Sequence, residues 1–167
     1  MRFELTQRYT STAAEVDRAY ARPELYPTLV GLPKLGRIQV LAHDATDDDP
    51  ARRLRVQFHF TGDLPAAVTA VVDPDRLSWV QETEHDHSGG RAQFRLVPDH
   101  YPDRLRCSGR FVVADTASGS TRIVTGELKV QALLVAGRVE QAIVSGLQEY
   151  LMAEAPVVDR WISERSV

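Results

Sequence analysis

The last part of the chain, from about Arg138 to Glu164, is one long amphipathic segment, and it limits the possible folds more than any other feature. A helix of this length measures about 40 Å at 1.5 Å per residue, which is enough to cross a whole sheet. Its apolar residues fall within one stripe at helical spacing, so the stripe must pack against an extended apolar surface. The stripe comprises Val139, Ile143, Gly146, Leu147, Tyr150, Val157, Val158 and Trp161.

Two residues disturb this stripe. Glu154 lies near its centre, where a buried carboxylate is costly unless it is paired or hydrogen-bonded. It either provides a polar contact at the end of an apolar ligand cavity, or it is solvated beyond the sheet or paired with an arginine. Pro156 cannot donate to the Met152 carbonyl, which costs about 3 kcal/mol in a straight helix. We therefore expect a kink or break near Met152–Ala155.

The preceding residues consist mostly of segments in which apolar and polar residues alternate, the pattern of half-buried strands. Two short helices follow the first strand. Thr12 and Glu15 have the spacing of a capping box at the start of one helix, and Pro23 begins a second that ends near Gly31. The predicted strands are residues 2–9, 37–42, 53–60, 77–85, 91–97, 105–114 and 121–132. The predicted order is strand, two helices, six strands and a long helix.

Length, charge and cysteine content exclude several classes of protein. A chain of 167 residues fits a single domain spanning 1–167. A net charge of −3 offers no basic face for nucleic acid, and no apolar run reaches the roughly 18–20 residues of a membrane span. The N-terminus lacks the apolar core of an export signal, and the single cysteine, Cys107, fits a reducing compartment. We expect a cytoplasmic protein.

Charged residues gather at the strand positions assigned to the outward face of the sheet. Arginines there could contact an acidic partner or RNA, but pairing with glutamates across neighbouring strands is the simpler explanation. The residues assigned to this face are Arg53, Arg55, Arg95, Arg106, Arg110 and Arg122, with Glu82, Glu84 and Glu127 among them.

The segment "TRIVTGELKVQALLVAGRVEQAIVSGLQEYLMAEAPVVDRWI", together with "GDLPAAV" before a Trp-bearing strand, resembles an uncharacterised bacterial family of the START-like (SRPBCC) superfamily. The resemblance implies an α+β helix-grip fold, in which a curved antiparallel sheet of about seven strands wraps around the C-terminal helix. Members of the superfamily bind sterols, phospholipids, polyketides, plant hormones or quinones, and some catalyse cyclisation or dehydration. The resemblance thus implies a cavity between sheet and helix but no particular chemistry.

The expected activity is the binding of a hydrophobic or amphipathic small molecule, such as a lipid, polyketide or quinone-like compound, in that cavity. If Trp79 points inward, the two-residue period of a strand sends Gln81, Thr83 and His85 the same way. A few polar groups within apolar walls are typical of small-molecule sites. The candidate ligand-binding residues are Phe58, Phe60, Trp79, Gln81, Phe94, Phe111, Ile143, Leu147, Tyr150 and Glu154, of which Gln81, Tyr150 and Glu154 would orient a polar head.

Two other functions stay open. A cyclase or dehydratase would need an acid–base pair, for which Glu154 and His85 are the candidates, and a regulatory protein-interaction domain would have a filled core and an exposed apolar patch. In "EHDHSGG", His85, Asp86 and His87 can ligate a metal, but "SGG" marks a hairpin tip and the sequence places no third or fourth ligand. We therefore expect no metal and no cofactor, and a buried, inert Cys107.

Overall fold

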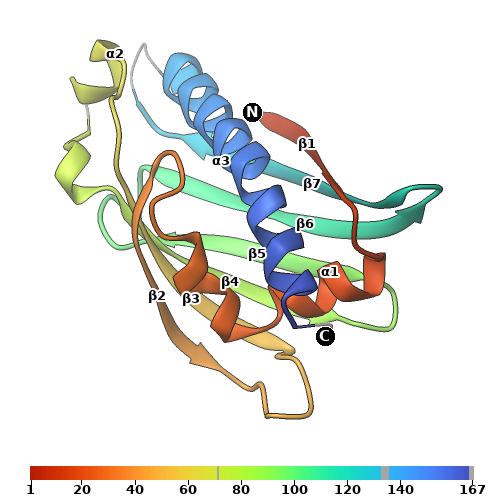
Figure 1. Cartoon of the computed structure of the whole chain (residues 1–167). Helices are drawn as coiled ribbons and strands as arrows, with labels where there is room; N and C mark the ends of the chain where they lie inside the picture. Colours follow the sequence, from red (N-terminus) through yellow and green to blue (C-terminus); the bar gives the residue numbers. More distant parts are fainter. Residues whose placement is uncertain (71, 133–135, 166–167) are drawn as a thin grey trace.

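The computed structural model describes residues 1–70, 72–132 and 136–165. Its order of elements is the predicted one: a strand, two short helices, six strands and a long C-terminal helix (Figure 1). Two further short turns, α2 and η2, lie between the third and fourth strands. The elements are β1 Arg2–Tyr9, α1 Ala13–Tyr20, the 3-10 helix η1 Pro23–Leu29, β2 Leu35–His43, β3 Arg53–Phe60, α2 Ala66–Thr69, the 3-10 helix η2 Pro74–Arg76, β4 Ser78–Asp86, β5 Arg91–Pro98, β6 Leu105–Thr116, β7 Gly119–Val130 and α3 Ala136–Ser163.

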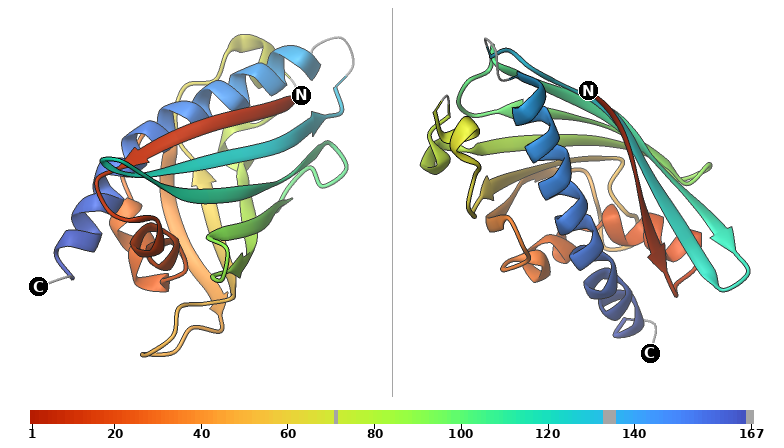
Figure 2. Two further views of the ribbon diagram at one scale, coloured as in Figure 1. Left: turned by 90° about the vertical axis from the view of Figure 1, so that its right-hand side faces the viewer. Right: turned by 90° about the horizontal axis from the view of Figure 1, so that it is seen from above.

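The seven strands form one antiparallel sheet in the order β1-β7-β6-β5-β4-β3-β2. Strands β2 to β7 follow one another as a meander, and β1 pairs with β7 and forms one edge of the sheet. Helices α1 and α3 and the 3-10 helix η1 lie on the same face of the curved sheet, and α3 crosses that face obliquely (Figures 1 and 2). This is the α+β helix-grip arrangement that the sequence predicts.

The start of α1 is fixed by two sets of contacts. The predicted capping box is present: Thr12 Oγ1 accepts from the Glu15 amide at 3.3 Å, and Glu15 Oε2 accepts from the Thr12 amide at 2.8 Å. The carboxylate of Asp159, on α3, accepts from the amides of Thr10 and Ser11 at 2.8 and 3.1 Å. These bonds tie the loop between β1 and α1 to the C-terminal half of α3.

Helix α3 continues through Pro156, so of the kink or break expected near Met152–Ala155, the break is wrong. The reason lies in exposure. Pro156 is exposed and Met152 is 67% exposed, so the carbonyl that Pro156 leaves without a donor lies on the solvent side of the helix. Water can bind a carbonyl there, which reduces the cost of the missing bond.

Two glycines opposite each other make room for aromatic rings on the inner face. Gly109 of β6 pairs with Gly126 of β7. A Cβ atom at Gly126 would lie 2.6 Å from Phe3 Cζ, and one at Gly109 would lie 2.8 Å from Phe94 Cε1. Only glycine lets these rings lie so close to the strands. Phe94 also stacks on Phe111, with ring centroids 4.6 Å apart.

Among the described residues, no helix is both long and apolar enough to cross a membrane.

Candidate functional site

Glu154 lies at the centre of a buried polar cluster between the sheet and the helices. Glu154 is 4% exposed, which excludes the alternative that its carboxylate is solvated beyond the edge of the sheet. Glu154 Oε2 accepts hydrogen bonds from Gln7 Nε2 at 3.0 Å and from the Tyr20 hydroxyl at 2.6 Å. Glu154 Oε1 accepts from the Tyr150 hydroxyl at 2.6 Å. The donors come from β1, α1 and α3, so the carboxylate connects three elements.

Arg122 supplies the positive charge of this cluster and is 4% exposed. Arg122 Nη1 lies 3.9 Å from Glu154 Oε2 and donates to Gln7 Oε1 at 2.6 Å, so the Gln7 amide bridges the two charges. The guanidinium carbon lies 3.8 Å from the ring centre of Tyr20 and 3.9 Å from that of Phe111. Cation–π contacts of this kind strengthen when they are desolvated.

The assignment of Arg122 to the outward face is therefore wrong. The two-residue period carries the signal that was missed, because Val124 and Leu128 of the same strand are buried on the inner face. The predicted outward pairing is present for two glutamates: Glu82 lies between Arg55, at 3.1 Å, and Arg95, and Glu84 pairs with Arg53 at 3.3 Å.

Burial and charge keep the hydroxyl groups of the cluster neutral. Burial raises the pKa of both Tyr20 and Tyr150, and the negative charge of Glu154 raises each further. Burial also raises the pKa of Tyr9, whose hydroxyl lies 2.8 Å from that of Tyr20. Burial alone would lower the pKa of Arg122, but the neighbouring Tyr20, Tyr9 and Glu154 raise it. The cluster therefore consists of a charged guanidinium and neutral phenol donors.

The residues proposed to line a cavity lie on the inner face and fall into two groups. Phe58, Phe94, Phe111, Tyr150 and Glu154 are buried, whereas Phe60, Trp79, Gln81, Ile143 and Leu147 are partly exposed. Trp79 stacks on Phe58 with ring centroids 5.9 Å apart, which confirms that it points inward. Solvent therefore reaches part of the inner face near Trp79 and the N-terminal half of α3.

Two hollows differ sharply in size and lining. A cavity of about 10 Å³ between α1 and the sheet is lined in part by Asp17, Tyr20, His85 and Arg122, and it has room for one water molecule. A hollow of about 940 Å³ lies on the outer face of the sheet, where charged side chains such as Arg55 and Glu82 line it. Its charged lining does not suit an apolar ligand.

No hydrogen bond or ion pair joins Glu154 and His85, the pair proposed for catalysis, among the described residues. The hydrogen bonds of Glu154 go to Gln7, Tyr20 and Tyr150, whereas His85 Nδ1 lies 4.0 Å from Asp17 Oδ1. Cys107 is buried, and burial raises the pKa of its thiol to about 12, as expected for an unreactive cysteine.

Comparison with known proteins identifies the fold. The sequence model of a family described as "Protein of unknown function (DUF2505)" matches residues 4–162. No curated protein matches the chain. A structure from Thermus thermophilus has a TM-score of 0.71 at 14% identity, with 100% of both chains covered.

Two further structures are similar along most of their length. An aromatase/cyclase from Streptomyces sp. R1128 has a TM-score of 0.64 at 14% identity, covering 100% of this chain and 96% of its own. A START superfamily protein from Mycobacterium smegmatis has a TM-score of 0.59 at 13% identity, covering 98% and 97%. These similarities show a START-like fold.

Proposed function

The chain belongs to the DUF2505 family. We propose that it binds a hydrophobic or amphipathic small molecule between the inner face of the sheet and the N-terminal half of α3. The observation that carries the proposal is the partial exposure of Trp79, Ile143 and Leu147, although all three point into the fold. An apolar ligand that covered these side chains would gain about 25 cal/mol for each Å² of apolar surface removed from water.

Gln81 is the polar group that we assign to the head of the ligand. It is partly exposed and neighbours Trp79 on the inner face of β4. Its Nε2 donates to Thr83 Oγ1 at 3.2 Å, which orients the amide. Its carbonyl oxygen then serves as an acceptor for a hydroxyl group of the ligand, consistent with an amphipathic compound.

Tyr150 and Glu154, which the sequence suggested would orient the polar head of a ligand, are better suited to a structural role. The hydroxyl of Tyr150 is bound to Glu154, and Glu154 receives three hydrogen bonds from side chains of the protein. We propose that they form the closed polar end of the site, where they hold α3 against β1 and α1. The polar group that contacts the ligand is then Gln81, which is partly exposed.

Size sets a further condition on binding. The internal cavity of about 10 Å³ holds only a water, whereas small-molecule sites usually measure about 300–1,000 Å³. The ligand must therefore enter where solvent already reaches the inner face, and the N-terminal half of α3 must move outward. On that side α3 is held to the loop before β2 by the ion pair of Lys34 Nζ and Glu149 Oε2, at 3.5 Å, which is weak because it is exposed. Near its start α3 is also held by Glu140, which accepts from the Val130 amide at 2.9 Å and pairs with the amine of Met1 at 3.1 Å, so the movement must break these contacts or leave the first turn in place.

The test is a titration with the apolar fluorophore N-phenyl-1-naphthylamine, combined with native mass spectrometry of freshly purified protein. Leu147→Trp enlarges a partly exposed side chain on the inner face of α3, and Gln148→Trp, at the adjacent exposed position, is the matched control. We expect the wild type and Gln148→Trp to bind the fluorophore equally, and Leu147→Trp to bind at least tenfold more weakly. A wild-type protein with a clean apo mass and no fluorescence enhancement would refute the proposal, and equal binding by all three would place the site elsewhere.

A further inference from the structure

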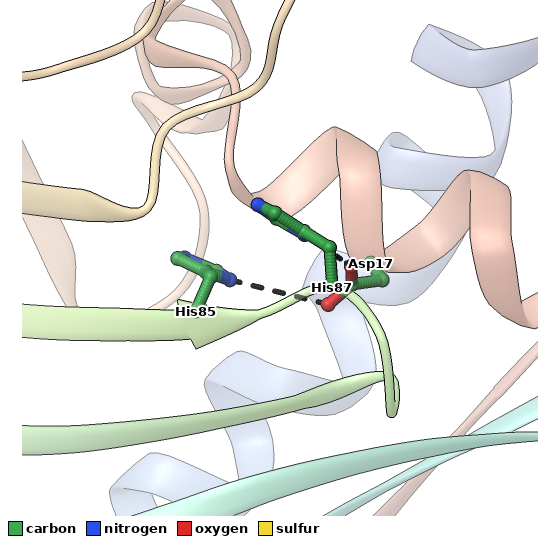
Figure 3. Close-up of side chains that lie close together, drawn as sticks. All are labelled: Asp17, His85 and His87. Carbon is green, nitrogen blue, oxygen red and sulfur yellow. Dashed lines mark hydrogen bonds and ion pairs between the residues drawn. The ribbon is translucent and has the colours of Figure 1, made fainter.

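Three side chains that can ligate a metal meet at the end of the sheet covered by α1. His85 lies near the end of β4, His87 lies two residues later in the turn to β5, and Asp17 lies on α1 (Figure 3). One ligand atom from each residue lies within 4.8 Å of the other two. Asp86, between the histidines, points away and accepts from Ser88 Oγ at 2.6 Å. The third ligand that the sequence did not place is therefore Asp17.

The contacts of His87 indicate which of its two ring nitrogens is available to ligate a metal. His87 Nε2 lies 3.1 Å from the carbonyl oxygen of Ala51, and His87 Nδ1 lies 2.6 Å from Asp17 Oδ2. A carbonyl only accepts, so Nε2 carries a hydrogen and Nδ1 faces the carboxylate. The Nδ1 atom is then the ring nitrogen that can ligate a metal ion together with Asp17, once the two atoms move apart from their hydrogen-bond distance of 2.6 Å. Metal-ligating histidines commonly donate their other N–H to a backbone carbonyl in this way.

His85 gives the second, independent indication. Its side chain is 3% exposed, and among the described residues neither ring nitrogen has a hydrogen-bond partner. Buried polar atoms are almost always partnered, so two such atoms in one ring call for an explanation. The ring is parallel to that of His87, with centroids 5.5 Å apart and an interplanar angle of 12°. His85 Nδ1 lies 4.0 Å from Asp17 Oδ1, too far for a hydrogen bond.

The charge of Asp17 completes the ligand set. Asp17 is 6% exposed, and its two carboxylate oxygens face the two imidazoles, Oδ2 at 2.6 Å from His87 Nδ1 and Oδ1 at 4.0 Å from His85 Nδ1. A buried carboxylate beside two imidazoles is a donor set that suits divalent ions of the late first-row transition metals.

We propose that Asp17, His85 and His87 form a binding site for a divalent transition metal ion such as Zn²⁺. Tetrahedral zinc with ligands at 2.0–2.2 Å separates its donor atoms by about 3.3 Å. His87 Nδ1 lies 2.6 Å from Asp17 Oδ2 and His85 Nδ1 lies 4.0 Å from Asp17 Oδ1, and one ligand atom from each of the three residues lies within 4.8 Å of the others. The short pair must therefore separate, and the more distant ligand atoms must approach by up to about 1.5 Å. Rotation of the side chains about their own bonds provides movements of this size.

The fourth coordination position opens into the water-sized cavity that His85 and Asp17 share with Tyr20 and Arg122. A water bound to the metal there would lie beside a permanent positive charge, which favours its hydroxide form or an exchangeable anion. His87, with its side chain 25% exposed, provides the route from solvent. The bound ion would also tie α1 to the β4–β5 turn.

The experiment uses untagged, chelator-treated protein titrated with Zn²⁺ by calorimetry, and with Co²⁺ by visible absorption, which reports tetrahedral ligation. We expect one ion per chain, a higher Tm with Zn²⁺, and at least a hundredfold weaker binding in His85→Gln and in His87→Gln. The matched control is His43→Gln, an exposed histidine on β2, which we expect to bind as the wild type does. Circular dichroism confirms that each variant is folded.

Two results would overturn the proposal. One is a wild type that takes up no Zn²⁺ and shows no Co²⁺ absorption band, which would leave Asp17 and His87 joined by a hydrogen bond alone. The other is unchanged affinity in His85→Gln. If a variant fails to fold, long-range ¹H–¹⁵N spectra of the wild type decide the question, because Zn²⁺ must shift the Nδ1 signals of His85 and His87 and leave those of His43 in place.

Discussion

Replacing Glu154 with glutamine tests whether the buried cluster depends on its charge pair. Glu154→Gln keeps the size of the side chain but removes the negative charge 3.9 Å from Arg122 Nη1. Arg122 is buried, and because a guanidinium group is not deprotonated in proteins, its charge stays in place without a counter-charge. Removing one partner of a buried pair costs about 3–5 kcal/mol. We expect the lower value, about 3 kcal/mol, because Gln7 still accepts from Arg122.

The assay is urea unfolding followed by circular dichroism, with the free energy extrapolated to water. A loss of about 3 kcal/mol corresponds to a fall in Tm of roughly 6–12 °C for a chain of this size. Glu149→Gln on the same helix is the matched control, because its pair with Lys34 is exposed and should cost no more than about 0.5 kcal/mol. The double variant Glu154→Gln/Arg122→Met should be more stable than additivity predicts. Equal losses in Glu154→Gln and Glu149→Gln, or strict additivity in the double variant, would refute the reasoning.

Three further changes test the fold. Burial alone would raise the pKa of Asp159, but hydrogen bonds from Thr10 and Ser11 hold it below its usual value. The contribution of ionised Asp159 to the free energy of unfolding is therefore complete above about pH 4 and is lost as the pH falls through the folded-state pKa. In urea titrations between pH 5 and 3, the wild type should lose about 1 kcal/mol more stability than Asp159→Asn. Gly109→Ala should cost about 2–3 kcal/mol, because its Cβ would meet the Thr125 carbonyl and lie 2.8 Å from the Cα of the facing glycine in β7; a Tm unchanged by this substitution would contradict the packing. Gly146→Ala in α3 should add up to about 1 kcal/mol, since its Cβ would lie at an ordinary 3.8 Å from a Lys34 carbon, and a lower Tm would show strain there.

Periodicity carries most of the fold. Seven alternating segments, a capping box at Thr12 and a long apolar stripe predicted the strands along the chain, the start of α1 and the extent of α3, because each depends on neighbours in sequence. The break at Pro156 was predicted wrongly for the opposite reason. Its cost depends on whether the freed carbonyl meets water, and that is decided by how α3 lies on the sheet.

In the candidate sites, too, the features that depend on neighbours in sequence were predicted and those that depend on packing were not. The inward direction of Trp79, Gln81 and His85 follows from the period of a strand and was predicted correctly. The partners of Glu154 and His85 were not predicted, because they come from other elements: Arg122 from β7 and Asp17 from α1. A sequence shows that a buried charge needs a partner, but only the packed structure shows which one it has.

The pairing of β1 with β7 has a consequence for how the chain reaches this structure. Phe3 lies opposite Gly126, so the first strand of the chain finds its neighbour only in the last strand of the sheet. Closing so long a loop costs entropy that local hairpins do not. The meander from β2 to β7 can form hairpin by hairpin, whereas β1, with Gln7 on it, must wait. During synthesis β1 therefore has no strand partner until β7 has been made, and Gln7 can bridge Glu154 and Arg122 only after α3 has followed.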